Sequence, residues 1–167
     1  MSGTHPAGPG VVRQLTVDEV WRALSHASFA VLSHVTPGGE PRSSGVVYVM
    51  SGNRMYVVVA QDSWKARQIT ANESVAVTVP IRRGGVMSLL VHIPPATISF
   101  PATALVHPGA MLADRPELAR LAPPERRDRF AVVEITPAGH FVTYGVGVPL
   151  MRMSDHAASR ARLSIEQ

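Results

Sequence analysis

Short valine-rich segments separated by turn residues constrain the fold of this chain more than any other feature. Three follow one another at residues 29–35, 42–50 and 54–60, and the turns between them read Thr36-Pro-Gly-Gly-Glu-Pro41 and Ser51-Gly-Asn53. β-Branched side chains suit a pleated, half-buried surface, and Gly, Pro and Asn supply tight turns. The pattern predicts a meander of three antiparallel strands.

The rest of the chain also consists largely of short apolar segments separated by turn residues. Further extended segments are predicted at residues 74–80, 86–93, 96–106, 130–136 and 140–146, the last of which would complete the sheet. Six to eight short strands with few helices imply a barrel or sandwich, because closure removes exposed hydrogen-bonding edges. The fold class is therefore mainly β, an antiparallel barrel or sandwich with peripheral helices.

The first of three predicted helices covers residues 16–27. Thr16 and Glu19 have capping-box spacing, in which each side chain satisfies an otherwise unpaired backbone N–H of the other residue. Val17, Val20, Trp21 and Leu24 share one face, so this helix should pack on the sheet.

The other two predicted helices cover residues 62–72 and 109–121. In the first, Asp62 or Ser63 can cap the helix, Asn72 ends it, and Trp64, Ile69 and the stem of Arg67 are expected to face inward. In the second, Pro116 fits the first turn of a helix that begins near Asp114 better than the middle of a longer one.

The length and composition indicate one globular domain. The chain has 167 residues, of which 46% are hydrophobic and 17% charged, a balance typical of a compact fold. Residues 1–14 are expected to form a flexible N-terminal tail and 15–146 the barrel domain. Residues 147–167 are expected to form a C-terminal tail that packs on the barrel or on a partner subunit, or stays loose.

Several classes of protein are disfavoured by what the sequence lacks. It has no cysteine, no signal-peptide pattern and no apolar run near the roughly 20 residues that span a bilayer. Its net charge of +4 is not gathered into a basic run or interleaved with aromatic residues. We therefore expect a cytoplasmic protein that binds neither nucleic acid nor membrane.

The histidines show no metal-binding pattern. The seven are scattered, without His-x-His or His-x-x-x-His spacing, so no metal site is predicted. His92 and His140 are conceivable axial ligands of a haem. No acid, base or nucleophile can be singled out as catalytic.

One stretch has a more specific pattern. Gly39-Glu-Pro41 leads into the second strand, which includes Val46, and Ser63-Trp-Lys65-Ala-Arg67-Gln-Ile69-Thr-Ala-Asn72 follows the third. In order and spacing this resembles the pyridoxamine 5′-phosphate oxidase-like proteins, the flavin-binding split barrels, which include a branch that uses a deazaflavin. The resemblance spans about residues 15–146.

The resemblance implies a β-barrel with peripheral helices, an antiparallel, Greek-key-like FMN-binding split barrel. It also implies a homodimer with the cofactor at the subunit interface and a small molecule as substrate. FMN is the expected cofactor, the deazaflavin coenzyme F420 is the alternative, and haem is less favoured. A phosphate needs N–H donors and positive charge, which a helix start with nearby cations supplies. The implied cofactor-binding residues are Arg42, Ser43, Ser44, Val46, Val59, Ala60, Ser63, Lys65, Arg67 and Gln68.

One position departs from the family pattern. Members closest to the pyridoxamine phosphate oxidases tend to carry Arg where this chain has Trp64. The oxidoreductase hypothesis therefore stands beside two alternatives: a non-catalytic flavin- or haem-binding module, and a homodimer whose site has degenerated.

Overall fold

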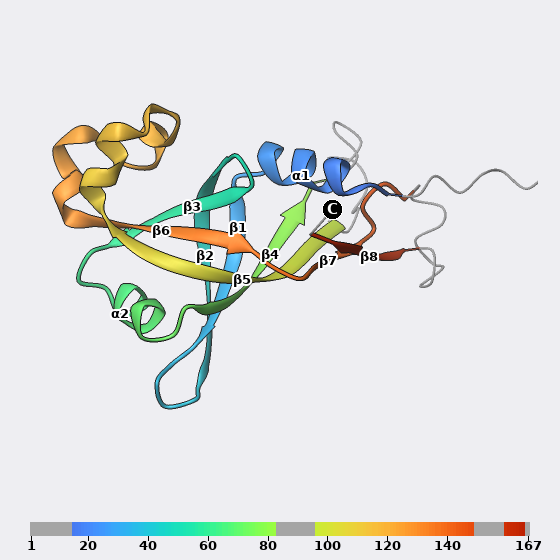
Figure 1. Cartoon of the computed structure of the whole chain (residues 1–167), viewed down its shortest axis with the longest axis horizontal. Helices are drawn as coiled ribbons and strands as arrows, with labels where there is room; N and C mark the ends of the chain where they lie inside the picture. Colours follow the sequence, from blue (N-terminus) through green and yellow to red (C-terminus); the bar gives the residue numbers. More distant parts are fainter. Residues whose placement is uncertain (1–14, 83–95, 149–158, 166–167) are drawn as a thin grey trace, which may run out of the picture.

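A single antiparallel sheet dominates the structure, a computed structural model that describes residues 15–82, 96–148 and 159–165. Its strands run in the order β4-β1-β2-β3-β6-β5-β7-β8 (Figure 1). They are β1 (Phe29–Val35), β2 (Pro41–Ser51), β3 (Arg54–Ala60), β4 (Ser74–Ile81), β5 (Ala96–Pro108), β6 (Phe130–Pro137), β7 (His140–Tyr144) and β8 (Arg160–Ser164). The predicted meander of β1, β2 and β3 is confirmed.

The sheet closes into a barrel through β5. This strand pairs with β4 along residues 96–103, with β6 along 102–108 and with β7 along 97–99. The β4–β5 ladder joins the two ends of the order β4-β1-β2-β3-β6-β5, so six strands form a closed antiparallel barrel. Closure leaves these strands without free edges, and β7 and β8 extend the sheet outside the barrel.

The barrel interior is filled mainly by aliphatic side chains. In β1, for example, Ala30, Leu32 and His34 are buried and their neighbours face outward, which is the alternation of a strand with one inner face. One end of the core is aromatic, because Phe141 makes edge-on ring contacts with Trp21 and Phe100 at centroid distances of 4.9 and 5.4 Å. The valine-rich composition is therefore explained by core packing.

The first predicted helix is confirmed as α1 (Val17–His26). Its capping box is formed: the Glu19 backbone N–H donates to the Thr16 hydroxyl at 3.3 Å, and the Thr16 N–H donates to the Glu19 carboxylate at 2.9 Å. Leu24 is fully buried, and its carbonyl accepts a 2.7 Å hydrogen bond from the Tyr48 hydroxyl on β2. Burial raises the pKa of the Tyr48 phenol. This neutral hydroxyl fastens the end of α1 to the barrel.

The single helix predicted over residues 109–121 is wrong. The chain forms three short 3-10 helices instead: η2 (Gly109–Asp114), η3 (Pro116–Leu121) and η4 (Pro124–Arg129). Pro116 has no N–H and disfavours helical geometry in the residue before it, so Arg115 adopts an extended φ of −130°. Pro116 does occupy the first turn of η3, as expected for a proline within a helix.

The sequence analysis also missed the last strand. It ended the sheet at residue 146, whereas β8 pairs with β7 from His140↔Ser164 to Tyr144↔Arg160. Arg160 and Arg162 are exposed, and Ala161 and Leu163 are half-buried. This short alternation is characteristic of an edge strand and was hidden by the charged residues. The strand predicted at 86–93 and the N-terminal tail at 1–14 lie outside the described residues.

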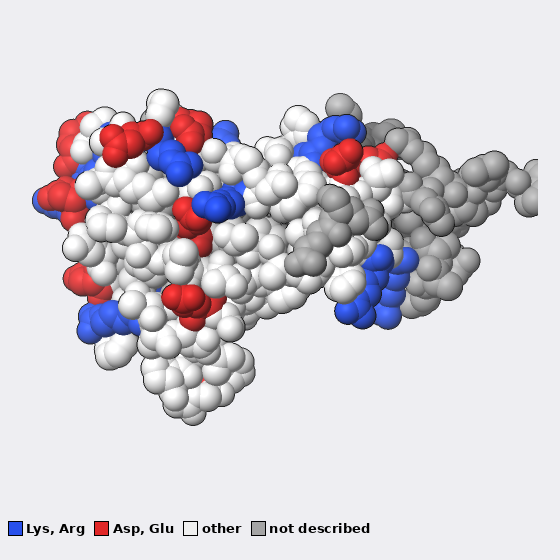
Figure 2. Space-filling model, in the orientation of Figure 1, with Lys and Arg blue, Asp and Glu red and all other residues white. Residues whose placement is uncertain are grey.

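No helix among the described residues is long and apolar enough to cross a membrane. Figure 2 shows that acidic and basic side chains are mixed over the 3-10 helices at one end of this face, while its middle carries few charges.

Candidate functional site

The Ser-x-Lys motif lies at the start of a short helix, α2 (Trp64–Ala71), which follows β3. Ser63 is its N-cap, with its hydroxyl accepting from the Ala66 N–H at 3.2 Å, and Asn72 is its C-cap. Ala66 and Ile69 are buried against the barrel. The predicted helix, its caps and the inward position of Ile69 are confirmed.

The prediction that Trp64 faces inward is wrong, because its side chain is 73% exposed. Positions 66 and 69 take the inner face of α2, and position 64 lies roughly 200° around the helix axis from position 66. The Arg67 guanidinium lies 4.9 Å from the centre of the Trp64 ring and donates to the Asp62 carbonyl at 2.7 Å. These two side chains therefore support each other on the outer face of α2.

An open cleft of about 410 Å³ lies between α2 and the 3-10 helices. Figure 1 shows these helices on opposite sides of the neighbouring ends of β3 and β6. The walls come from β2, β3, α2, η3 and the start of β6, and the lining residues are Gly45, Val46, Val47, Val58, Val59, Ala60, Ser63, Lys65, Arg120, Leu121 and Phe130. The cleft thus has an apolar strand surface with cationic side chains at its rim.

Lys65 is the most unusual charged group of this cleft. Its side chain is half-buried, and desolvation lowers the pKa of its ammonium group. In the part of the chain that the structure describes, no carboxylate pairs with it. Removing a charge from water without a partner is costly, so an anion that enters the cleft would offset a cost already present in the free protein.

Half of the residues predicted to bind the cofactor meet in this cleft. Val46, Val59, Ala60, Ser63 and Lys65 all line it, although they come from three different elements. The meander brings β2 and β3 side by side, and the turn after β3 places α2 beside their ends.

The three predicted residues at the start of β2 lie outside the cleft lining. Arg42 is exposed and pairs with Glu40 at 2.7 Å, and the Ser43 hydroxyl shares a 2.7 Å hydrogen bond with Ser33. The Ser44 hydroxyl is buried and has no hydrogen-bond partner among the described residues. These positions precede the part of β2 that reaches the cleft.

Two predicted residues of α2 also have local partners instead. Arg67 stacks on Trp64, as described above, and the side-chain amide of Gln68 is hydrogen-bonded to the Nε2 atom of His34 at 2.7 Å. His34 is buried in the barrel, so this bond attaches α2 to β1.

Sequence reasoning missed six lining residues, and one of them carried a signal. Gly45 interrupts a valine-rich strand, and a glycine inside a strand often marks a close approach by another group. A Cβ atom at Gly45 would lie 2.8 Å from the Phe29 ring. The ring therefore covers the backbone there, which gives this side of β2 a flat surface. Val47, Val58, Arg120, Leu121 and Phe130 carried no comparable signal.

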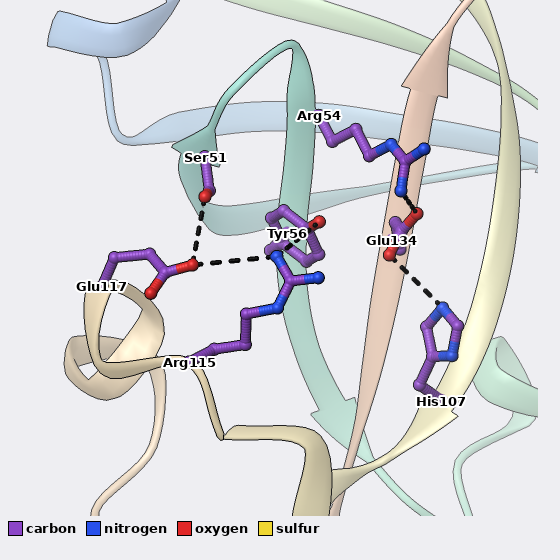
Figure 3. A network of polar contacts seen from close by, with 7 residues as sticks. All are labelled: Ser51, Arg54, Tyr56, His107, Arg115, Glu117 and Glu134. Carbon is purple, nitrogen blue, oxygen red and sulfur yellow. Dashed lines mark hydrogen bonds and ion pairs between the residues drawn. The ribbon is translucent and has the colours of Figure 1, made fainter. Parts of the chain in front are cut away.

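Polar contacts fix the position of η3 at the cleft (Figure 3). Glu117 of η3 accepts from the Ser51 hydroxyl of β2 at 3.1 Å and pairs with Arg115 at 3.7 Å. Arg115 in turn donates to the Tyr56 hydroxyl of β3 at 3.4 Å and lies over its ring. The segment that supplies one wall of the cleft is thereby held on two strands.

A second group of polar side chains lies on the neighbouring strands. Glu134 of β6 is buried, and its carboxylate accepts from Arg54 of β3 at 2.7 Å and lies 3.5 Å from the His107 Nε2 atom of β5 (Figure 3). Charged residues are rarely buried unless they are paired, and these contacts link the three adjacent strands β3, β6 and β5.

A closed six-stranded antiparallel barrel with a short helix after its third strand is a split β-barrel, and this is the fold class of the chain. Solved structures confirm that assignment. A haem-binding protein from Mycobacterium smegmatis aligns with a TM-score of 0.66 at 16% identity over 92% of this chain and 60% of its own. An F420 reductase aligns with a TM-score of 0.54 at 19% identity, over 72% and 93% of the two chains.

A third structure is a putative pyridoxamine 5′-phosphate oxidase from Listeria innocua. It aligns with a TM-score of 0.56 at 18% identity, over 72% of this chain and 91% of its own. No protein-family model and no curated protein sequence matches the chain. At these identities the similarity establishes the split-barrel fold, and function has to be argued from the cleft.

Proposed function

We propose that this protein binds a flavin-type cofactor with an anionic tail in the cleft, and that it is an oxidoreductase acting on a small molecule. The observation that carries the proposal is the half-buried, unpaired Lys65 at the start of α2, beside an apolar surface formed by β2 and β3. FMN is the proposed cofactor and F420 the alternative. An F420 reductase and a putative pyridoxamine 5′-phosphate oxidase have the same fold.

The residues of the cleft fit such a molecule in two parts. Lys65 offers a point charge to a phosphate. The first backbone N–H groups of α2 lie at the positive end of the helix dipole, so they also favour an anion there. Val47, Val58 and Val59 offer apolar area to a flat ring, and the Phe29 ring packed over Gly45 keeps this side of β2 flat. Ser63 is engaged as the N-cap and positions these donors.

The protein's own contribution is then binding, orientation and exclusion of water. A bound flavin supplies the hydride chemistry itself. Arg67 has a different role from the one expected from the sequence: it stacks on the Trp64 ring on the outer face of α2. No side chain of the described cleft has the position and chemistry of a general base, and we assign none.

We further propose that the protein is a homodimer with the cofactor at the subunit interface. Phe29 and Val47 face each other across β1 and β2 on the outer surface of the barrel, and they are 47% and 65% exposed. Val47 also lines the cleft. A second copy seated on this surface would cover both side chains and close the open side of the cleft, since exposed apolar area of this kind favours association.

Haem is the competing ligand, because one structural neighbour is a haem-binding protein. Among the described residues no histidine lines the cleft, and the buried His34 is hydrogen-bonded to Gln68. The geometry therefore favours a flavin.

The test is an absorption spectrum of the purified protein, followed by calorimetric titration with FMN, F420 and haemin. Wild-type protein should bind FMN or F420, and Lys65→Ala should weaken that binding about 10- to 100-fold, the worth of one charge-assisted hydrogen bond. Arg162→Ala on β8 removes an exposed cation away from the cleft and should leave the affinity unchanged. A Soret band with no flavin binding, or an unchanged affinity in Lys65→Ala, would refute the proposal.

A further inference from the structure

A second cation, Arg120, lines the same cleft from the side opposite Lys65. It belongs to η3, whereas Lys65 belongs to α2, and Figure 1 shows α2 and the 3-10 helices on either side of the strand ends. The side chain is exposed, and none of the carboxylates in the described ranges pairs with it. Its guanidinium is therefore available to a ligand.

The backbone that carries Arg120 is well anchored. Leu118 of η3 is fully buried, Glu117 bonds to β2, and Arg115 contacts Tyr56 on β3 (Figure 3). Because these contacts fix η3 directly before Arg120, and the buried Ala122 follows it, Arg120 stays at the rim of the cleft while its side chain remains free to reach inward. Leu121, the next residue, is itself part of the lining.

The two ends of the cleft differ in what they offer. The α2 end has an ammonium group and helix N–H donors, which suit a compact phosphate. The η3 end has Arg120 beside Leu121 and Phe130, so that a planar cation adjoins apolar side chains. That combination suits the carbonyl-bearing edge of a flat ring, since a guanidinium donates two parallel hydrogen bonds in one plane.

We propose that Arg120 is a second cofactor-binding residue, which binds the ring end of the flavin while Lys65 binds its phosphate. The cleft accordingly selects flavin-type molecules with an anionic tail. Their ring carries hydrogen-bond acceptors and becomes negatively charged on reduction. This inference rests on the proposed function.

Riboflavin, which is FMN without its phosphate, separates the two ends experimentally. FMN and riboflavin are titrated into wild-type protein, Lys65→Ala, Arg120→Ala and Arg120→Lys, with Arg126→Ala on η4 as the matched control. Lys65→Ala should weaken FMN binding and leave riboflavin binding unchanged. Arg120→Ala should weaken both about 10-fold, the worth of one hydrogen bond to a charged group, and Arg120→Lys should recover part of the loss.

The midpoint potential of bound FMN gives a second measurement. Reduction by dithionite adds two electrons and one proton to the neutral ring and leaves it with one negative charge. A nearby cation favours that form, so Arg120→Ala should lower the potential, and Arg120→Lys should largely preserve it. A variant that merely perturbed the fold would not distinguish Lys from Ala in this way.

The outcomes are distinguishable. Wild-type protein that binds neither FMN nor F420 would refute the proposed function and this inference with it. Wild-type binding with an unchanged affinity and potential in Arg120→Ala would refute the inference alone. A loss of FMN affinity in Arg120→Ala without a loss for riboflavin would also overturn it, because Arg120 would then serve the phosphate.

Discussion

Lys65 is the only lysine in the chain, and it lines the cleft half-buried, with no carboxylate partner among the described residues. The motif around Lys65 predicted that it binds the cofactor, and it predicted the same role for Arg67 and Gln68. The structure separates them, because successive positions of a helix point in different directions and only positions 63 and 65 face the cleft. Arg67 and Gln68 found partners in Trp64 and His34.

The lowered pKa of Lys65 predicts a pH dependence of cofactor binding. Burial favours the neutral amine in the free protein, whereas an anionic ligand requires the ammonium form, so binding raises the pKa. The affinity for FMN should therefore be full below the pKa of the free protein and fall as pH rises through it, earlier than for an ordinary lysine. Titrations across the alkaline range measure this.

Lys65→Arg is the matched variant for that measurement. A guanidinium stays charged throughout the range, so binding by this variant should show no comparable decline. A parallel decline in both proteins would assign the effect to another group.

At the scale of elements, prediction succeeded where the local sequence decides the structure. Strands β1, β2 and β3 and helices α1 and α2 were predicted within one or two residues, because valine alternation, glycine turns and helix caps are local signals. The 3-10 helices were not, because Pro116 interrupts the helical pattern and η3 is held by contacts with distant strands, such as Glu117 with Ser51. For the same reason Arg120 could not be connected to the cleft from sequence alone.

Gly109, the first residue of η2, is expected to be essential for the arrangement of the 3-10 helices. A Cβ atom there would approach the carbonyl oxygens of Arg127 and Phe130 within 1.9 and 2.4 Å, and both belong to the backbone. Gly109→Ala should therefore destabilise the fold by about 2–3 kcal/mol and weaken cofactor binding by moving Phe130. Chemical denaturation and flavin titration measure the two effects.

Gly38→Ala is the control for that substitution. A Cβ atom at Gly38 meets nothing closer than 3.8 Å, so this variant should unfold like the wild type. Equal stability of the two glycine variants would contradict the prediction, because it would show that the backbone around η2 shifts to accommodate the added Cβ at little cost.

At the scale of the whole molecule, the barrel was predictable with the help of the family resemblance, and the strand pairing that closes it was not. Alternating short strands imply a barrel or sandwich, yet nothing local indicates that β4 pairs with β5 or that β5 pairs with three strands. These pairings, and the β7–β8 extension, depend on contacts between residues that lie far apart in the sequence.

The proposed homodimer makes a prediction at this scale. Val47→Asp places a charge in the surface proposed as the interface, so the variant should be monomeric and bind FMN more weakly, since burial of an unpaired carboxylate is costly. Size-exclusion chromatography with light scattering reports the oligomeric state. Val142→Asp makes the same change at an exposed valine on β7, where the side chain is 48% exposed, and this variant should remain dimeric.

A monomeric wild-type protein at micromolar concentration would contradict the dimer, and dissociation by Val142→Asp instead of Val47→Asp would move the interface to β7. Neither result would by itself exclude flavin binding, because the cleft is formed within one chain.

The pairing of β5 with three strands has a consequence for how the protein unfolds. One strand supplies hydrogen bonds to the barrel on both its edges and also to the β7–β8 extension. The extension cannot detach without exposing the edge of β5 at residues 97–99, in the stretch that also pairs with β4. We therefore expect the barrel and the β7–β8 extension to unfold as one cooperative unit.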